Sequence, residues 1–88
     1  MRTLLAALIE DTERQIPLLE VAIAATDSEQ CARLAHYCKG ACSNLGATSA
    51  AARLKTLEQY AKRGDMDECA RQMGLLAVEL DRLRAEEI

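Results

Sequence analysis

His36 is the one histidine of the chain and the side chain best suited to act as a nucleophile. Helical residues advance by about 100° each, so the surroundings of His36 follow from the sequence. An apolar arc lies roughly 160° to 260° away, formed by Cys31, Leu34, Ala35, Cys38, Cys42 and Leu45. Small and polar residues lie within roughly 60° of it: Glu29, Ala32, Arg33, Lys39, Gly40 and Ser43. We therefore expect the imidazole on a solvated helix face, where it is accessible to a reaction partner.

Length and composition limit what this nucleophile can do. With 88 residues, the chain can form one domain with a modest core, but not separate cofactor and substrate domains. It contains no Phe or Trp, one Pro and four Gly, and its many alanines and leucines favour helices. No apolar run approaches the roughly 20 residues that a membrane span needs. The first apolar stretch soon meets Glu10 and Asp11, so we expect no signal peptide and a cytoplasmic location.

The four cysteines raise the alternatives of a metal site, a disulfide or a buried core. Cys31, Cys38 and Cys42 fall on one helical stripe, and no two cysteines have the C-x2-C spacing of a zinc site. His36 lies on the opposite face of that helix, so it cannot share a metal with these sulfurs. Free cysteine is commonly a small buried residue, and we therefore predict reduced core thiols, with Cys69 completing the set.

The N-terminal third has the periodicity of an amphipathic helix. The inward positions recur at intervals of three and four: Leu5, Ile9, Thr12, Ile16, Leu19 and Ile23. Pro17 removes a backbone donor, so we expect a kink or a short break near Gln15.

Turn and capping residues predict where the next helices begin and end. Thr26-Asp27-Ser28 ends the first segment, and Asp27 is a candidate N-cap for the His36 helix, with Gln30 three residues later. That helix should run to about Leu45 and end at Gly46. Thr48 or Ser49 should cap the following helix, whose inward residues are Leu54, Leu57 and Ala61.

Gly64 should end the third helix, and Asp65 should cap the N-terminus of the last one. Glu68, three residues after Asp65, completes a capping box. The last helix carries an inward stripe formed by Cys69, Met73, Leu76, Leu80 and Leu83. Short loops favour antiparallel neighbours, so the sequence predicts an all-α, up-down antiparallel four-helix bundle.

Charge is distributed unevenly along the chain. Residues 28–64 carry a net charge of +4, from six basic and two acidic residues, whereas residues 1–27 carry −3 and residues 65–88 carry −4. A basic region of this kind suits an acidic protein partner or a phosphoryl group. Nucleic acid is a weaker alternative, because six basic residues with almost no stacking aromatics make a poor binding surface.

Residues 34–47 resemble the signature of histidine-containing phosphotransfer (Hpt) domains of bacterial multistep phosphorelays. The matching residues are Ala35-His36, Lys39-Gly40 and, after a run of mostly small residues, Gly46-Ala47. The similarity continues without a gap through Leu57-Glu58, Ala61 and Gly64-Asp65, and back to Glu10-Asp11-Thr12, covering nearly the whole chain. Cys38 stands where leucine is usual and Ala50 where a larger aliphatic residue is common. Both departures concern packing.

The resemblance implies a role for each residue of the signature. His36 would accept a phosphoryl group on Nε2 from the aspartyl phosphate of one receiver domain and pass it to another receiver. Lys39 would offset developing negative charge, and Gly40 would leave room for the partner's active site. A histidine side chain with its ordinary pKa of about 6.5 is largely neutral at cytoplasmic pH. We expect the partner-binding surface to include residues beside His36: Ala32, Arg33, Tyr37 and Ser43.

A relay role implies partners but no cofactor of its own. The Mg²⁺ for phosphoryl transfer would be bound by the receiver domain. The sequence has neither a glycine-rich phosphate loop nor an acidic metal cluster, so we expect no autonomous kinase activity, no metal site and no nucleic-acid or direct membrane contact. Residues 1–88 would form one Hpt-like domain, either a stand-alone protein or a piece of a hybrid sensor histidine kinase. The alternative is a helical adaptor that binds receiver or kinase domains without transferring phosphate.

Overall fold

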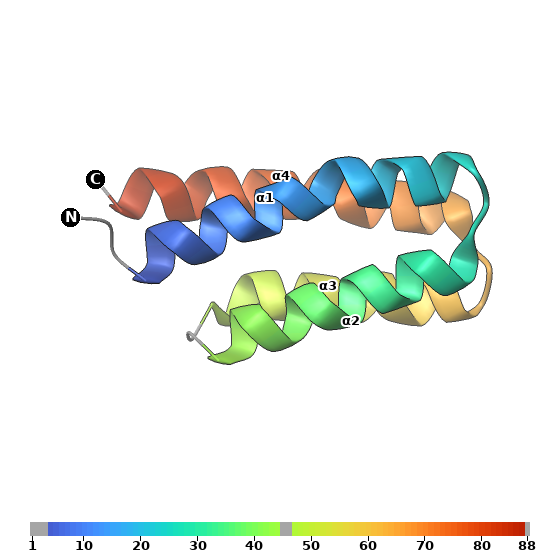
Figure 1. The fold of residues 1–88 in the computed structure, drawn as a ribbon, viewed down its shortest axis with the longest axis horizontal. Helices are drawn as coiled ribbons and strands as arrows, with labels where there is room; N and C mark the ends of the chain where they lie inside the picture. The colour runs from blue at the N-terminus through green and yellow to red at the C-terminus, as the bar shows by residue number, and fades with distance from the viewer. Residues whose placement is uncertain (1–3, 45–46, 88) are drawn as a thin grey trace.

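Four antiparallel helices form the computed structural model, which describes residues 4–44 and 47–87 (Figure 1). They are α1 (Leu4–Ala24), α2 (Ser28–Asn44), α3 (Thr48–Lys62) and α4 (Met66–Glu87). The described residues include no β-strand. The predicted all-α, up-down four-helix bundle is therefore confirmed.

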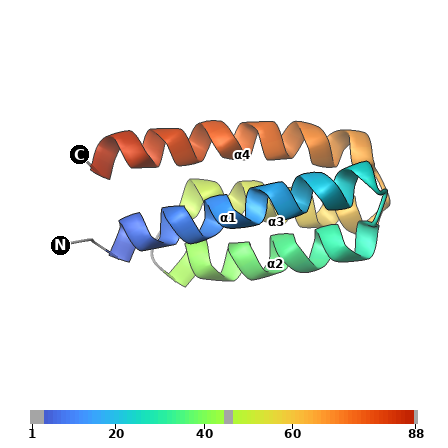
Figure 2. The same ribbon diagram turned by 45° about the horizontal axis from the view of Figure 1, so that its top comes forward.

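The helices form a closed ring in which each helix packs against two others. The contacting pairs are α1 with α2, α2 with α3, α3 with α4, and α1 with α4. Figures 1 and 2 show that the turns α1–α2 and α3–α4 lie together at one end of the bundle, opposite the two termini. The resulting molecule is elongated, 39 × 19 × 16 Å. Within the part of the chain that is described, no helix combines the length and apolarity that crossing a membrane requires.

The core is built mainly from alanine, cysteine and leucine side chains. All four cysteines are buried and unpaired, which confirms their predicted place in the core. The inward residues predicted for the other helices are buried or packed against the core, including Ile9, Leu19, Leu54, Leu57, Ala61, Leu76 and Leu80. The side chain of Leu5 lies outside the described part, as do Leu45 and Gly46. Cys38 and Ala50, the two departures from the Hpt signature, are both buried.

Two turns of the same design connect α1 to α2 and α3 to α4. Thr26 and Gly64 have positive φ angles of 55° and 76°, the left-handed conformation that commonly ends a helix. An aspartate follows each of them and caps the next helix. Asp27 Oδ1 accepts the N–H of Gln30 at 3.1 Å, and Asp65 Oδ1 accepts the N–H of Glu68 at 3.2 Å. Both predicted aspartate caps are confirmed.

The predicted cap of α3 is wrong. Neither Thr48 nor Ser49 is the N-cap, because the helix already begins at Thr48 and Ala47 occupies the capping position with no side-chain hydrogen bond. The buried Ala47 donates its N–H to the carbonyl of Cys42 at 2.9 Å, and its own carbonyl accepts the N–H of Ala51 at 3.0 Å. Backbone bonds and burial of the methyl group therefore replace a hydroxyl cap.

Pro17 does not break α1, which continues as one helix from Leu4 to Ala24. Of the two alternatives predicted near Gln15, a break is thus excluded. Pro17 lies on the exposed side of the helix. The backbone carbonyl that loses its donor there can be hydrated, which lowers the cost of proline within a helix.

Candidate functional site

His36 stands on the solvent-facing side of α2. Its side chain is 70% exposed, whereas Cys31, Ala35, Cys38 and Cys42 of the same helix are buried. The stripe of buried residues at helical spacing turns the opposite face, with His36, outward. The predicted solvent-facing position of the imidazole is confirmed.

A buried carboxylate from the neighbouring helix holds the ring. Glu58 of α3 has a side chain only 8% exposed, and its Oε2 lies 3.2 Å from Nδ1 of His36. Helices α2 and α3 run antiparallel, which brings these residues face to face although they are 22 positions apart in the sequence. The His36 ring is therefore accessible from solvent, while its Nδ1 is held by Glu58.

Two lysines share the same carboxylate. Lys39 Nζ, from the helical turn after His36, lies 2.8 Å from Glu58 Oε1. Lys62 Nζ, one turn beyond Glu58 on α3, lies 3.2 Å from Oε2. Burial raises the pKa of Glu58, but the hydrogen bonds and positive charges of the two lysines outweigh it and hold the pKa below its ordinary value. Glu58 is thus an anion at neutral pH.

The charge of Glu58 determines which ring nitrogen of His36 can react. An ionised carboxylate can only accept hydrogen bonds, so Nδ1 of His36 must carry the proton and donate it to Oε2. In a neutral imidazole the other nitrogen, Nε2, then bears the free lone pair. Glu58 therefore selects the tautomer in which Nε2 is the unprotonated ring nitrogen.

Gly40 lies on the exposed surface of α2, one turn after His36. A Cβ atom built at this position meets nothing within 4 Å. Close packing within the described chain therefore does not explain the glycine, which costs about 0.8–1.0 kcal/mol relative to alanine in a helix.

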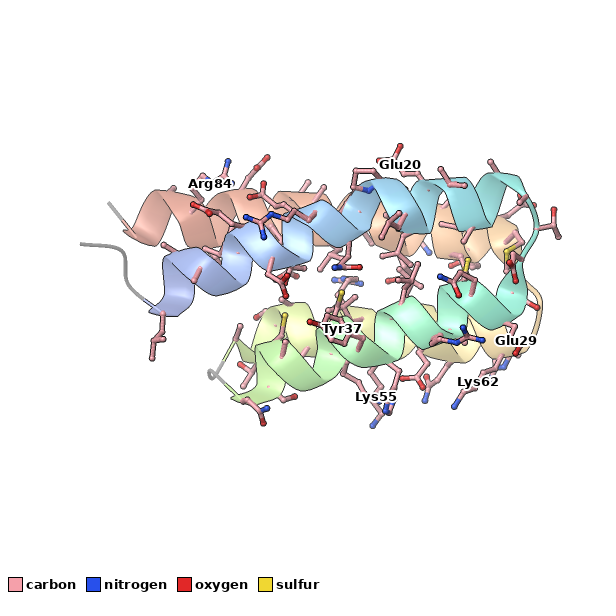
Figure 3. The ribbon with its side chains drawn as sticks, viewed as in Figure 1. Glu20, Glu29, Tyr37, Lys55, Lys62 and Arg84 are labelled. Carbon is pink, nitrogen blue, oxygen red and sulfur yellow. The ribbon has the colours of Figure 1, made fainter. Side chains whose placement is uncertain are left out.

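The predicted partner-binding residues differ in accessibility. Arg33 and Ser43 are exposed, and Tyr37 is 57% exposed on the face that Figure 3 presents to the viewer. The Tyr37 hydroxyl donates to Asp11 Oδ2 of α1 at 3.5 Å. Ala32 is only partly buried, but it packs against the core. Three of the four thus present their side chains to solvent around His36.

The basic region predicted for residues 28–64 is divided between different surfaces. Figure 3 places Lys55 and Lys62 along one edge of the α2–α3 pair. Arg53 instead donates to Gln72 of α4 at 3.0 Å, and Arg63 lies over the ring of Tyr60. Only part of the positive charge counted in the sequence therefore lies on the surface that carries His36.

Glu58 and Lys62 are the residues of this site to which the sequence analysis assigned no role. Glu58 was included in the matched segment and in the charge count only. One feature of the sequence does mark it, because it is the sole acid between Arg53 and Arg63 in a stretch that is otherwise basic. Lys62 follows it at i+4, the spacing of neighbours on a helix surface.

No group of three or more histidine, cysteine or acidic side chains in the described ranges could hold a metal ion. The cysteines lie in the core, and His36 has its Nδ1 occupied by Glu58. The site itself offers an exposed, oriented imidazole and two ammonium groups that share one carboxylate.

Two comparisons with known proteins find similarity over most of the chain. The model of the family described as "Hpt domain" matches residues 3–86. The crystal structure of histidine-containing phosphotransfer protein B (HptB) from Pseudomonas aeruginosa PAO1 superposes with a TM-score of 0.89 at 30% sequence identity. The match covers 96% of this chain and 73% of that one. Comparison with curated protein sequences finds no similar protein.

Proposed function

The chain belongs to the Hpt domain family, and from this premise we propose that His36 is the phosphoacceptor of a phosphorelay. It takes a phosphoryl group from the aspartyl phosphate of one receiver domain and passes it to the aspartate of another. We propose further that residues 1–88 act as one such domain. The observation that carries the proposal is the 3.2 Å contact between His36 Nδ1 and Glu58 Oε2, because it leaves Nε2 of an exposed ring as the reactive nitrogen.

In the first step, the lone pair of Nε2 attacks phosphorus, and the bond between phosphorus and the aspartate oxygen breaks. The receiver's carboxylate is the leaving group. The ring becomes positively charged as the new bond forms, while the proton on Nδ1 stays hydrogen-bonded to Glu58. The hydrogen bond from Nδ1–H to Glu58 Oε2 strengthens as the ring becomes charged, which stabilises the transition state.

In the onward step, the second receiver's aspartate attacks the same phosphorus, and the bond from phosphorus to Nε2 breaks. The ring departs as neutral imidazole with its Nδ1 proton still in place. No proton therefore needs to leave or enter His36 in either direction. The Mg²⁺ ion belongs to the receiver, whose cations would stabilise the charge on the transferring group.

Lys39 and Gly40 support the transfer in different ways. Lys39 pairs with Glu58 Oε1 at 2.8 Å, and its positive charge keeps the buried carboxylate ionised. Gly40 places no side chain beside the imidazole, so that a receiver can bring its aspartate within the roughly 3–3.5 Å needed for reaction. Arg33, Tyr37 and Ser43 are the exposed side chains proposed to contact that receiver.

The test is to mix the purified domain with receiver domains that carry a labelled aspartyl phosphate. Transfer to this chain should yield an acid-labile phosphate that survives base, and adding an unphosphorylated second receiver should discharge it. A domain that binds the receivers but gains no phosphate from any of them would refute the proposal and favour the non-transferring adaptor.

A further inference from the structure

Lys62 shares one oxygen atom with the proposed phosphoacceptor. Its Nζ lies 3.2 Å from Glu58 Oε2, the same atom that lies 3.2 Å from His36 Nδ1. The ammonium group and the ring nitrogen thus cannot be farther apart than twice 3.2 Å. Lys62 is 66% exposed, so neither packing nor burial explains its position.

A carboxylate alone would be an ambiguous partner for a nucleophilic histidine. It selects the tautomer with a proton on Nδ1, but a nearby negative charge also favours the imidazolium form. In that form both ring nitrogens carry protons, and Nε2 has no lone pair to attack phosphorus. A site that uses Glu58 to orient His36 therefore benefits from positive charge that offsets its effect on ring protonation.

Two lysines provide positive charge next to the Glu58 carboxylate. Lys39 occupies Oε1 and Lys62 occupies Oε2, so the carboxylate and its two lysines together carry one net positive charge. Lys39 belongs to the signature that identified the site. Lys62 does not, although it is bonded to the same oxygen as His36.

We propose that Lys62 is a positioning residue that acts through Glu58 Oε2 to keep the His36 imidazole neutral while Nδ1–H remains bound. The inference deepens the proposed function, because its consequence is a larger nucleophilic fraction of His36. The charge state of the ring is nevertheless a property of the free domain and can be measured without any receiver.

Other charged groups of α1, α2 and α3, within the described ranges, form no ion pair or hydrogen bond with Glu58. On α2, Arg33 is paired with Glu29 at 3.3 Å. On α1, Asp11 accepts the Tyr37 hydroxyl. On α3, Lys55 lies on the same edge as Lys62 in Figure 3. The ion pairs among the described residues do not include Lys55. Lys55 is therefore a matched control, with the same charge and the same helix but no bond to Glu58.

The experiment compares the wild-type domain with Lys62→Gln, Lys62→Arg and Lys55→Gln. The pH at which the His36 ring resonances titrate is measured by NMR. Lys62→Gln removes positive charge close to the ring, so its titration midpoint should rise by about half a pH unit, the size expected for a unit charge at that range in a water-like dielectric. Lys62→Arg should titrate like the wild type, and Lys55→Gln should move the midpoint clearly less than Lys62→Gln does. Circular dichroism checks that each variant is folded.

The same variants are then assayed for phosphoryl acceptance as a function of pH. The acid limb of the rate profile should move to higher pH in Lys62→Gln by the amount seen in the NMR titration. A midpoint unchanged by Lys62→Gln, or moved equally by Lys55→Gln, would overturn the role of Lys62. If the wild type accepts no phosphate at all, the proposed function fails, and the NMR titration still decides whether Lys62 controls the ring.

Discussion

Glu58 Oε2 lies 3.2 Å from His36 Nδ1, so a buried acid on α3 fixes the ring that α2 exposes to solvent. The two residues contribute differently to the site: His36 provides access and Glu58 provides orientation. Exposure of His36 allows a macromolecular partner to approach, and the bond to Glu58 removes the rotational and tautomeric freedom that an exposed ring would otherwise have. Orientation of this kind is a recognised source of rate enhancement.

Replacing Glu58 should slow phosphoryl acceptance while leaving His36 exposed. We expect Glu58→Ala to lower the rate by about tenfold or more, since a tenfold loss corresponds to about 1.4 kcal/mol of barrier. The rate of Glu58→Gln should fall between those of the wild type and Glu58→Ala, because the amide carbonyl can still accept Nδ1–H but carries no charge. Glu29→Ala, which removes an exposed acid of α2 paired with Arg33, is the control. Wild-type rates in Glu58→Ala, measured by single-turnover transfer, would contradict the assigned role.

The ion cluster of Glu58 should make the bundle lose stability in acid. Since the pKa of Glu58 is lowered by its lysines in the folded state, folding stabilises the ionised form. That contribution is fully present above the ordinary pKa of 4.5 and is lost as the pH falls through the folded pKa. Urea unfolding of the wild type and of Glu58→Gln between pH 7 and pH 3 should show a stability difference that shrinks below about pH 4.5. A difference that stays constant down to pH 3 would be inconsistent with this ion cluster.

The core thiols should be unreactive in the folded protein. Burial raises the pKa of Cys38 to about 12 and the pKa of Cys69 to about 11, with smaller contributions from nearby thiol and carboxylate groups. Because the thiolate is the reactive form, a chromogenic disulfide reagent at pH 7.5 should label the native domain slowly and the denatured domain rapidly. Native labelling at the denatured rate would mean that the helices do not protect these residues.

Gly40 should separate transfer from stability. A Cβ there meets open space, so Gly40→Ala should stabilise the bundle by up to about 0.8–1.0 kcal/mol in helix propensity while slowing transfer. Gly40→Leu should nearly stop transfer and keep the helical circular dichroism and cooperative melting. Transfer at the wild-type rate by Gly40→Leu would show that receivers do not approach over this surface. Loss of folding would instead show that Gly40 serves the packing of α2.

The sequence predicted the elements well because its signals are local. The inward stripe Cys31–Cys38–Cys42 and the aspartate caps Asp27 and Asp65 depend on residues within one or two helical turns. The face of His36 follows from the same stripe. The start of α3 was predicted wrongly because Ala47 caps it through backbone bonds and burial, for which no residue type is diagnostic.

The partner of His36 was not predicted, because it depends on how two helices pack. Which residue of α3 faces His36 is set by the turn between the helices and by their relative rotation, and neither can be computed from the periodicity of either helix alone. Glu58 could have been noticed as an isolated acid among basic residues, but its burial and its bonds to Lys39 and Lys62 required the assembled bundle.

The central claim is that Nε2 of His36 accepts the phosphoryl group. The most direct measurement is NMR of the domain labelled with ¹⁵N in its histidine ring, before and after transfer from a phosphorylated receiver, with His36→Gln in parallel. We expect phosphorus attached to Nε2, Nδ1 still protonated, and no phosphate on His36→Gln. That variant should melt at a temperature close to the wild type, since surface substitutions usually change stability by no more than about 0.5 kcal/mol. Phosphate on Nδ1, phosphate on another residue, or labelling of His36→Gln would contradict the claim.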